Sequence, residues 1–171
     1  MEFKDVVVKR QSVREYTDQP VPDDRLRRVL EAARLAPSGG NRQAWKFVVV
    51  KDPGTRQKLS QACNNQAFVG QAPVVIAAVA TNPERVMMCG VPSYAIDMGI
   101  AMEHVALAAA DEGLGTCWIG AFSQEQVRKI LGVPDKYTVA AVMPLGYPTQ
   151  LRDARPRKPF EEVFCFEKFT E

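Results

Sequence analysis

Two short basic segments near opposite ends of the chain carry residue types suited to holding an anion. In the first, Lys9, Arg10 and Arg14 fall within six residues that contain no acid. Guanidinium groups bind phosphate or carboxylate oxygens through paired, charge-assisted hydrogen bonds. The second segment spans residues 152–158, and its basic members are Arg152, Arg155, Arg157 and Lys158.

The first segment also holds a hydroxyl, at Ser12. Side chains alternate in an extended backbone, so Arg10, Ser12 and Arg14 would then point to one side. Such a trio can grip a phosphate or a carbonyl-rich ring. A solvated charged turn would have the same spacing, and the spacing alone leaves both interpretations open.

Signatures of catalysis by side chains are missing from the sequence. His104 is the one histidine, and the sequence has neither a phosphate-binding P-loop nor a His-Glu-x-x-His motif. The run of residues 113–120 has glycines like a dinucleotide fingerprint, but its third glycine is two places late and it opens a strand. The four cysteines form no Cys-x-x-Cys pair, so no metal site is predicted. The pattern is typical of a protein whose bound cofactor carries the chemistry.

The composition describes an ordinary globular domain. The 171 residues are 46% hydrophobic, with a formal net charge of +2, and this length favours one domain. The small charge argues against a nucleic-acid or membrane-surface partner. The longest apolar run, residues 72–80, is too short to span a bilayer. Glu2, Lys4 and Asp5 interrupt any signal-peptide core, so we expect a cytoplasmic protein.

Helices and strands must position these groups. Apolar periodicity and stop signals predict helices over 3–10, 23–36, from about 53, over 93–112, and from a Ser123/Gln126 capping box to about 132. Strands are predicted at 45–50, 73–80, 115–119 and 138–145. This alternation by itself favours a parallel, doubly wound sheet.

The end of the chain has a different character. Residues 146–159 contain three prolines and four basic residues with little periodicity, which predicts an extended arm. Four phenylalanines follow, and aromatic side chains at a chain end indicate that the end docks on something. They are Phe160, Phe164, Phe166 and Phe169.

Seven segments, in order along nearly the whole chain, resemble the nitroreductase family of FMN-dependent oxidoreductases. They are Arg10-x-Ser12-x-Arg14, residues 36–45, residues 72–75, the helix carrying Asp97, residues 113–120, Gly146-Tyr-Pro148 and Arg157-Lys158-Pro159. The resemblance implies an α+β fold with a mixed central β-sheet flanked by helices, in an intertwined homodimer. Residues 1–171 would form a single domain, with 146–171 as an extended C-terminal arm.

The same resemblance implies how FMN is held. Arg10 and Arg157 would bind the phosphate, helped by Ser12 and Lys158. Arg14 would lie beside N1 and O2 of the flavin, where a cation stabilises the negative charge of the reduced ring.

Further cofactor residues follow from the resemblance. The loop with Pro37, Ser38, Gly39 and Asn41 would reach the flavin of the partner subunit. A backbone N–H near Gly120 and Ala121 would approach flavin N5. Asn65 would bond the ring edge, with Asn64 and Gln66 as alternatives. Ala44 replaces a second proline that many relatives carry, and the helices that shape the substrate pocket of larger members are missing.

The resemblance implies that NADH or NADPH gives hydride to flavin N5 and that an electron acceptor, such as a nitroaromatic or a quinone, then takes it. No side chain is expected to be catalytic in its own right. Other flavin chemistry on the same fold, either reductive dehalogenation or flavin fragmentation, is an alternative. A non-catalytic FMN-sequestering protein is another.

Overall fold

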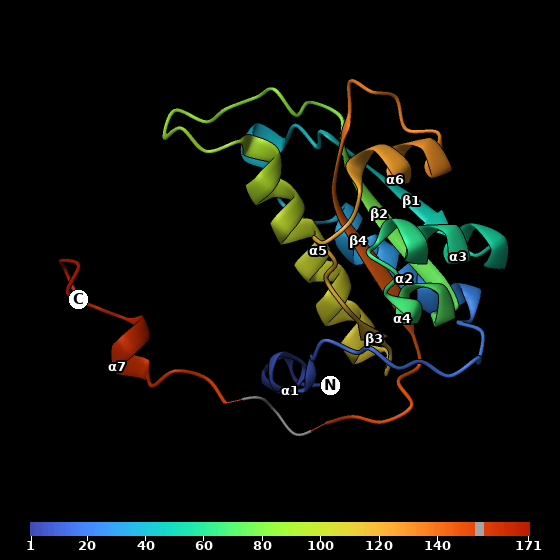
Figure 1. Cartoon of the computed structure of the whole chain (residues 1–171). Helices are drawn as coiled ribbons and strands as arrows, with labels where there is room; N and C mark the ends of the chain where they lie inside the picture. The colour runs from blue at the N-terminus through green and yellow to red at the C-terminus, as the bar shows by residue number, and fades with distance from the viewer. Residues whose placement is uncertain (153–155) are drawn as a thin grey trace.

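A four-stranded sheet lies between two layers of helices (Figure 1). The computed structural model describes residues 1–152 and 156–171. The strand order is β1-β2-β4-β3, and the strands are β1 Trp45–Val50, β2 Val74–Ala80, β3 Gly115–Thr116 and β4 Thr138–Gly146. The helices are α1 Phe3–Lys9, α2 Asp23–Arg34, the 3-10 turn Gly39–Asn41, α3 Pro53–Ala62, α4 Ala67–Gln71, α5 Ser93–Asp111, α6 Gln124–Leu131 and α7 Phe160–Val163.

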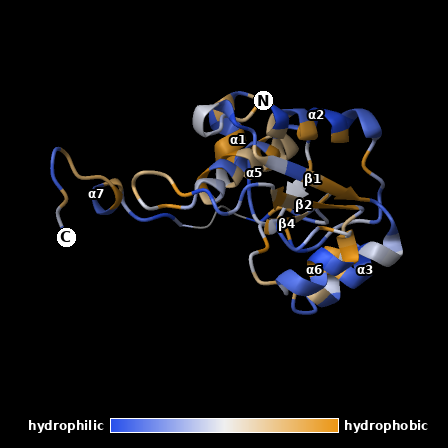
Figure 2. Cartoon of the chain, turned by 90° about the horizontal axis from the view of Figure 1, so that it is seen from above, coloured by the Kyte–Doolittle hydropathy of each residue, from blue (hydrophilic) through white to orange (hydrophobic). Residues whose placement is uncertain are grey.

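The central strand β2 is buried along its whole length because helices cover both of its faces. Val74, Ile76 and Ala78 pack in one core with α2 and α5. The alternate residues of β2 pack in a second core with α3, α4 and α6. Figure 2 shows the apolar strands in the middle and the polar helix surfaces outside.

Local signals set several boundaries as predicted. The Ser123 side chain accepts a hydrogen bond from the N–H of Gln126 (3.3 Å), and Gly132 ends α6 with a φ of 65°. Gly113 has a φ of 73° just past α5, a backbone conformation that glycine adopts without steric cost. Asp52 caps α3 through the N–H of Thr55 (2.7 Å).

The α+β fold is confirmed, whereas the parallel sheet that periodicity alone favoured is wrong. β1 pairs with β2, β2 with β4, and β3 with β4, all antiparallel. The helices α3 and α4 connect β1 to β2. A helical connection usually joins parallel strands, but here β2 runs antiparallel to β1. Ser12 and Thr116 form a parallel bridge at the β3 edge, which is where the described sheet becomes mixed.

The third predicted strand is shorter than expected. β3 ends at Thr116, and Ile119 rejoins the sheet only through an isolated bridge to Val142. Residues 117 and 118 leave the ladder between these two points. This places the following glycine, Gly120, in an exposed turn.

The end of the chain leaves the body of the molecule. Residues 147–149 still pair with residues 15–17, through a bridge between Tyr16 and Pro148 and a hydrogen bond from the N–H of Thr17 to the carbonyl of Tyr147 (2.9 Å). Beyond them, α7 and the C-terminus project to one side of α5 (Figures 1 and 2). Among the described residues, no helix is both long and apolar enough to cross a membrane.

Candidate functional site

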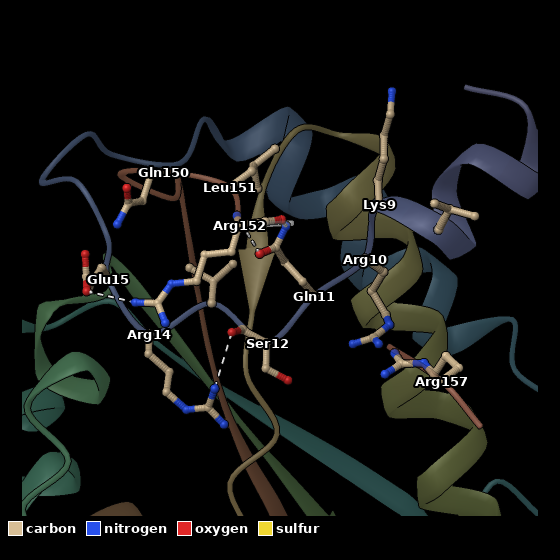
Figure 3. A pocket seen from close by; sticks show the side chains of 12 residues that line it. Lys9, Arg10, Gln11, Ser12, Arg14, Glu15, Gln150, Leu151, Arg152 and Arg157 are labelled. Carbon is tan, nitrogen blue, oxygen red and sulfur yellow. Dashed lines mark hydrogen bonds and ion pairs between the residues drawn. The ribbon is translucent and has the colours of Figure 1, made fainter. Parts of the chain in front are cut away.

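A cavity of about 530 Å³ lies where the segment after α1 meets the segment after β4 (Figure 3). Its walls come from two stretches that are more than 130 residues apart in sequence. The lining residues are Val8, Lys9, Arg10, Gln11, Ser12, Val13, Arg14, Glu15, Gln150, Leu151, Arg152 and Arg157.

The first wall is an extended segment fixed to the edge of the sheet. The N–H of Val13 donates to the carbonyl of Thr116 (2.8 Å), and the Val13 side chain is buried. Because the side chains alternate, Ser12 and Arg14 remain exposed at the cavity. Figure 3 shows Arg10 directed to the same side as these two. The structure therefore brings together the trio that the sequence singled out.

The second wall is tied to the first by hydrogen bonds. The side chain of Gln11 accepts from the N–H of Arg152 (3.0 Å) and donates to its carbonyl (3.3 Å). Glu15 accepts from Arg152 through Oε1 (3.4 Å), and its carbonyl accepts from the N–H of Thr149 (3.2 Å). These bonds hold residues 149–152 in place across the cavity.

Positive charge dominates the described lining. Five of these side chains are cationic and Glu15 is the one carboxylate, although the whole chain carries only +2. Glu103 on α5 approaches from behind, with its Oε1 3.4 Å from Nε of Arg10. This pair leaves the terminal nitrogens of the Arg10 guanidinium available to a ligand. An anion is the ligand that such a lining favours.

The two predicted phosphate-binding arginines line this one cavity. Arg157 reaches it from the arm, and Figure 3 shows its guanidinium group directed toward that of Arg10. Lys158 is exposed and does not contribute to the lining. Arg155, another member of the basic segment, lies outside the described residues.

The loop predicted to reach the flavin of a partner subunit lies elsewhere. Pro37, Ser38, Gly39 and Asn41 form no part of this cavity. The N–H of Gly39 donates to Oδ1 of Asp97 (3.0 Å), which fixes the loop near the start of α5. This hydrogen bond anchors the loop at α5, outside the cavity of its own chain.

The remaining predicted residues form a second group. Asn65 is exposed in the turn between α3 and α4, with a φ of 56°. Its neighbour Gln66 donates to the carbonyl of Ala121 (3.4 Å), so this turn lies beside Gly120 and Ala121. A Cβ added to Gly120 would meet no atom within 4 Å, which leaves the backbone there open to a ligand.

Two titratable groups under the first wall are kept neutral. Tyr16 and Cys117 are both buried. Burial raises the pKa of Tyr16 far above its usual value, and it raises the pKa of Cys117 despite the opposing effects of Arg14 and Ser12. A thiol with a raised pKa is a poor nucleophile. These buried side chains support the wall, with the Tyr16 hydroxyl donating to the carbonyl of Val13 (2.9 Å).

Sequence reasoning missed the polar residues that join the walls. Gln11, Glu15 and Gln150 line the cavity beside the predicted arginines. Gln11 lies between Arg10 and Ser12 in the chain, and its side chain meets the backbone of Arg152 across the cavity. No local signal could identify its partner, because the contact joins residues 141 positions apart.

The donor set fits a phosphorylated cofactor such as FMN. Arg10, Ser12 and Arg157 offer charged and neutral hydrogen-bond donors at one end of a cavity wide enough for more than a phosphate. Arg14 continues the same row, and Gly120 leaves open backbone beyond β3. The chemistry of the lining is thus what an extended, singly phosphorylated ligand requires.

Comparison with known proteins identifies the family of this chain. A family model described as "Nitroreductase family" matches residues 7–94 and 63–147, which together cover most of the chain. The chain belongs to the nitroreductase family. The chain is 33% identical to a Thermus thermophilus protein named NADH dehydrogenase, with 95% of each chain covered.

Solved structures agree with this assignment. A nitroreductase family protein from Clostridium novyi NT is 38% identical to this chain, with a TM-score of 0.83 over 87% of this chain and 86% of that one. The NADPH:FMN oxidoreductase from Vibrio harveyi, whose structure was determined with NAD+, is 28% identical, with a TM-score of 0.90 over 99% of this chain and 78% of that one.

Proposed function

We propose that this chain is an FMN-dependent NAD(P)H oxidoreductase that passes hydride from NADH or NADPH to an electron acceptor such as a nitroaromatic or a quinone. One observation carries the proposal: Arg10, Ser12, Arg14 and Arg157 line a single cavity. Membership of the nitroreductase family supports it. So do relatives named FMN reductase from Bacillus subtilis and NADPH-flavin oxidoreductase from Vibrio harveyi.

The residues of the cavity would divide the work of holding FMN. Arg10, Ser12 and Arg157 bind its phosphate, with Lys158 adding positive charge nearby. Arg14 lies at the pyrimidine end of the ring, where its cation balances charge that accumulates on reduction. Bound FMN supplies the acceptance and donation of hydride.

A second group of residues would frame the flavin ring. Gly120 and Ala121 present open backbone toward the ring, and Asn65 contacts the ring edge from the adjoining turn. The proximity of the two turns, shared through Gln66 and Ala121, supports this grouping. Asn64 and Gln66 remain alternatives to Asn65 for the ring contact.

The site would be completed by a second copy of the chain. Pro37, Ser38, Gly39 and Asn41 are held at the start of α5, away from their own cavity, which fits a loop that serves a partner. The outer face of α5 carries apolar side chains around Glu103, with Ile96 exposed and Ile100 and Leu107 half-buried at helical spacing. A homodimer that buries this face explains its composition. A cytoplasmic location stays a prediction.

The decisive experiment starts with the colour of the purified protein. We expect flavin absorbance, release of FMN on denaturation, and bleaching by NADH or NADPH without oxygen. Steady-state kinetics with a quinone should give parallel double-reciprocal lines, since both substrates use one site in turn. Arg10→Ala should weaken FMN retention, whereas Arg27→Ala, an exposed arginine on α2 outside the cavity, should not.

Other outcomes would identify the alternatives. A yellow protein that neither nicotinamide can reduce would be an FMN-sequestering protein. Halide release from a halogenated aromatic, or loss of the flavin itself during turnover, would indicate dehalogenation or flavin fragmentation. A protein that stays colourless after reconstitution with FMN would refute the proposal.

A further inference from the structure

The ladder between β3 and β4 is broken at one position. β3 pairs with β4 up to Thr116, and the pairing resumes in the same register at Ile119 and Val142. The shared register places Cys117 opposite Pro144, between these two points. Ile119 and Val142 donate to each other's carbonyls (2.9 and 3.1 Å), and such doubly bonded pairs recur at every second residue of an antiparallel ladder. Cys117 and Pro144 therefore stand where the next two hydrogen bonds belong.

Pro144 explains the break. It has no backbone N–H and so cannot donate to the carbonyl of Cys117. It is buried in β4, which lies between β2 and β3, and proline is seldom found in such a central strand because it removes a ladder hydrogen bond. Among the residues that the structure describes, neither the N–H nor the carbonyl of Cys117 has a backbone partner. The missing donor thus accounts for the departure of residues 117 and 118 from the ladder.

The hydroxyl of Tyr16 lies at this break. Its oxygen is 3.4 Å from the carbonyl oxygen of Pro144 and 2.9 Å from that of Val13. In an unbroken ladder the Pro144 carbonyl would accept the N–H of Cys117, so the hydroxyl stands in the place of that N–H. Burial raises the pKa of Tyr16 far above its usual value, and the hydroxyl therefore keeps the proton that it donates.

The bond to Val13 ties the first wall of the cavity to the break. The N–H of Val13 donates to the carbonyl of Thr116 (2.8 Å), and its own carbonyl accepts from Tyr16. Both backbone groups of Val13 are thus fixed, and its side chain is buried. Because side chains alternate in an extended segment, this anchoring directs the neighbours Ser12 and Arg14 into the cavity.

An unbroken ladder would give Val13 a different partner. Parallel pairing at Ser12 and Thr116, continued by one step, offers the carbonyl of Val13 to the N–H of Trp118. Within the described part of the chain that N–H has no backbone partner. The Tyr16 hydroxyl and a continued strand thus compete for one carbonyl. The proline decides this competition, because it keeps the chain after β3 out of the ladder.

We propose that Pro144 and Tyr16 act as a pair of positioning residues for the flavin site. The N–H that Pro144 lacks leaves room for the Tyr16 hydroxyl, and the hydroxyl holds Val13 so that its two neighbours face FMN. The inference rests on the proposed FMN site. Neither residue of the pair lines the cavity, so both act through the first wall and not by contact with the cofactor.

Two measurable properties depend on this positioning. Ser12 serves the phosphate, so its displacement weakens FMN binding. Arg14 serves the pyrimidine end of the ring, where its cation favours the reduced flavin, so its displacement lowers the midpoint potential of bound FMN. A purely structural role of the pair would lower the stability of the fold and leave the potential of the bound flavin unchanged.

Variants at both positions test the pair. Pro144→Val and Pro144→Ala each restore an N–H opposite Cys117, and Tyr16→Phe removes the hydroxyl. We expect each variant to weaken FMN binding by about threefold to tenfold, the loss of one neutral hydrogen bond, and to move the midpoint potential to a more negative value. Pro144→Val combined with Tyr16→Phe should lose no more than the larger single loss, because the restored N–H then has no hydroxyl to displace.

Pro134→Ala and Tyr137→Phe are the matched controls. Pro134 is exposed in the connection between α6 and β4, and Tyr137 lies just before β4 and outside the cavity. Neither change should alter the FMN dissociation constant or the midpoint potential.

A loss in Pro144→Ala that Pro144→Val does not share would assign the effect to packing of the ring and overturn the proposal. Additive losses in the combined variant would overturn it as well, as would an unchanged potential in Tyr16→Phe. Tyr16→Phe removes a single oxygen atom, so it gives a result even where a variant at position 144 does not fold. If the unmodified chain does not bind FMN, the proposed function fails, and that result is distinct from a failure of the positioning pair.

Amide hydrogen exchange tests the break independently of FMN affinity. In the chain as purified, the amide of Cys117 should exchange faster than that of Ile119, which is bonded to Val142. Pro144→Val should slow exchange at Cys117 by about tenfold, since its amide gains a ladder hydrogen bond. Equal exchange at the two amides of the unmodified chain, or no slowing in Pro144→Val, would overturn the proposal.

Discussion

Two segments from opposite ends of the chain supply guanidinium groups to one cavity, but they are supported in different ways. Residues 10–17 lie against the sheet, held through Val13 and Thr116 and through the Tyr16 hydroxyl, which donates to the carbonyl of Val13 (2.9 Å). The described arm from residue 156 onward has no such bonds to the body. The first segment is preorganised by its own fold, whereas the arm depends on something outside it.

This difference separates two ways of building a binding site. A side chain on a packed segment loses little freedom on binding, so its contact appears almost fully as affinity. A side chain on an unsupported arm must first be ordered, and ordering one residue costs on the order of 1–2 kcal/mol for its backbone alone. Arg10 and Arg157 therefore have similar chemistry but should contribute unequal affinities.

The largest effect should come from breaking the support of the first segment. A Cβ added at Gly115 would lie 2.8 Å from Cβ of Val13, closer than real contacts allow. We expect Gly115→Ala to lower the free energy of unfolding by about 1–3 kcal/mol and to displace Ser12 and Arg14 from the cavity. Thermal denaturation and FMN titration measure both effects. Gly54→Ala, at an exposed position in the first turn of α3, is the control. An unchanged melting temperature in Gly115→Ala would contradict the packing argument.

The next effect compares the two arginines directly. Arg10→Ala should weaken FMN binding by about 1.5–3 kcal/mol, the usual value of a charged hydrogen bond. It also leaves the Glu103 carboxylate, now unpaired, facing the phosphate site. Arg157→Ala should cost less in the same titration, because ordering of the arm offsets part of its contact. A greater loss for Arg157 than for Arg10 would reverse the comparison.

A smaller effect on FMN affinity should follow from removing the hydrogen bonds that join the two walls of the cavity. Gln11→Ala removes two hydrogen bonds to the backbone of Arg152, each contributing about 0.5–1.5 kcal/mol. We expect faster amide hydrogen exchange at residues 149–152 and a modest loss of FMN affinity, with exchange in β2 unchanged. Unaltered exchange at 149–152 would mean that the tie does not order the second wall.

The smallest expected effect is on the pH dependence of the free energy of unfolding. It should depend on a cysteine in the packed core and not on a cysteine in the arm. Cys63 is buried in the core around α3, and burial raises its pKa from 9.0 to about 11. The thiol therefore keeps its proton in the folded state while the unfolded chain releases it. Its contribution to stability is fully present below pH 9 and is lost as pH rises toward 11. Denaturant unfolding should show this fall, and Cys63→Ala should make it shallower, whereas Cys165→Ala should not.

Much of the local structure could be predicted from the sequence because it depends on neighbours in the chain. The Ser123 cap and the glycine after α5 follow from short-range hydrogen bonding and backbone preference, and the bounds of β1 follow from its aromatic and β-branched residues. The placement of Arg10, Ser12 and Arg14 on one side likewise depends only on the local backbone, because side chains alternate along an extended segment. The short helix α4 was not predicted, since its five residues are too few to show periodicity.

The candidate site was predictable only in part. The residue types pointed to anion binding, and the resemblance supplied which arginines would meet. That Gln11 joins Arg152, or that Asp97 holds the 37–41 loop away from the cavity of its own chain, depends on contacts between distant residues. Such contacts leave no trace in the spacing of either segment.

The sequence by itself determined which side chains are available and where most helices begin and end, and its residue types pointed to a bound cofactor. The tertiary structure decided the antiparallel direction of β1, β2 and β4, and the meeting of residues 10–15 with residues 149–152 and Arg157. The physical reason is that strand direction and long-range contact are chosen by burial of two shared cores. Burial is a property of the whole chain, whereas propensity and capping act within a few residues.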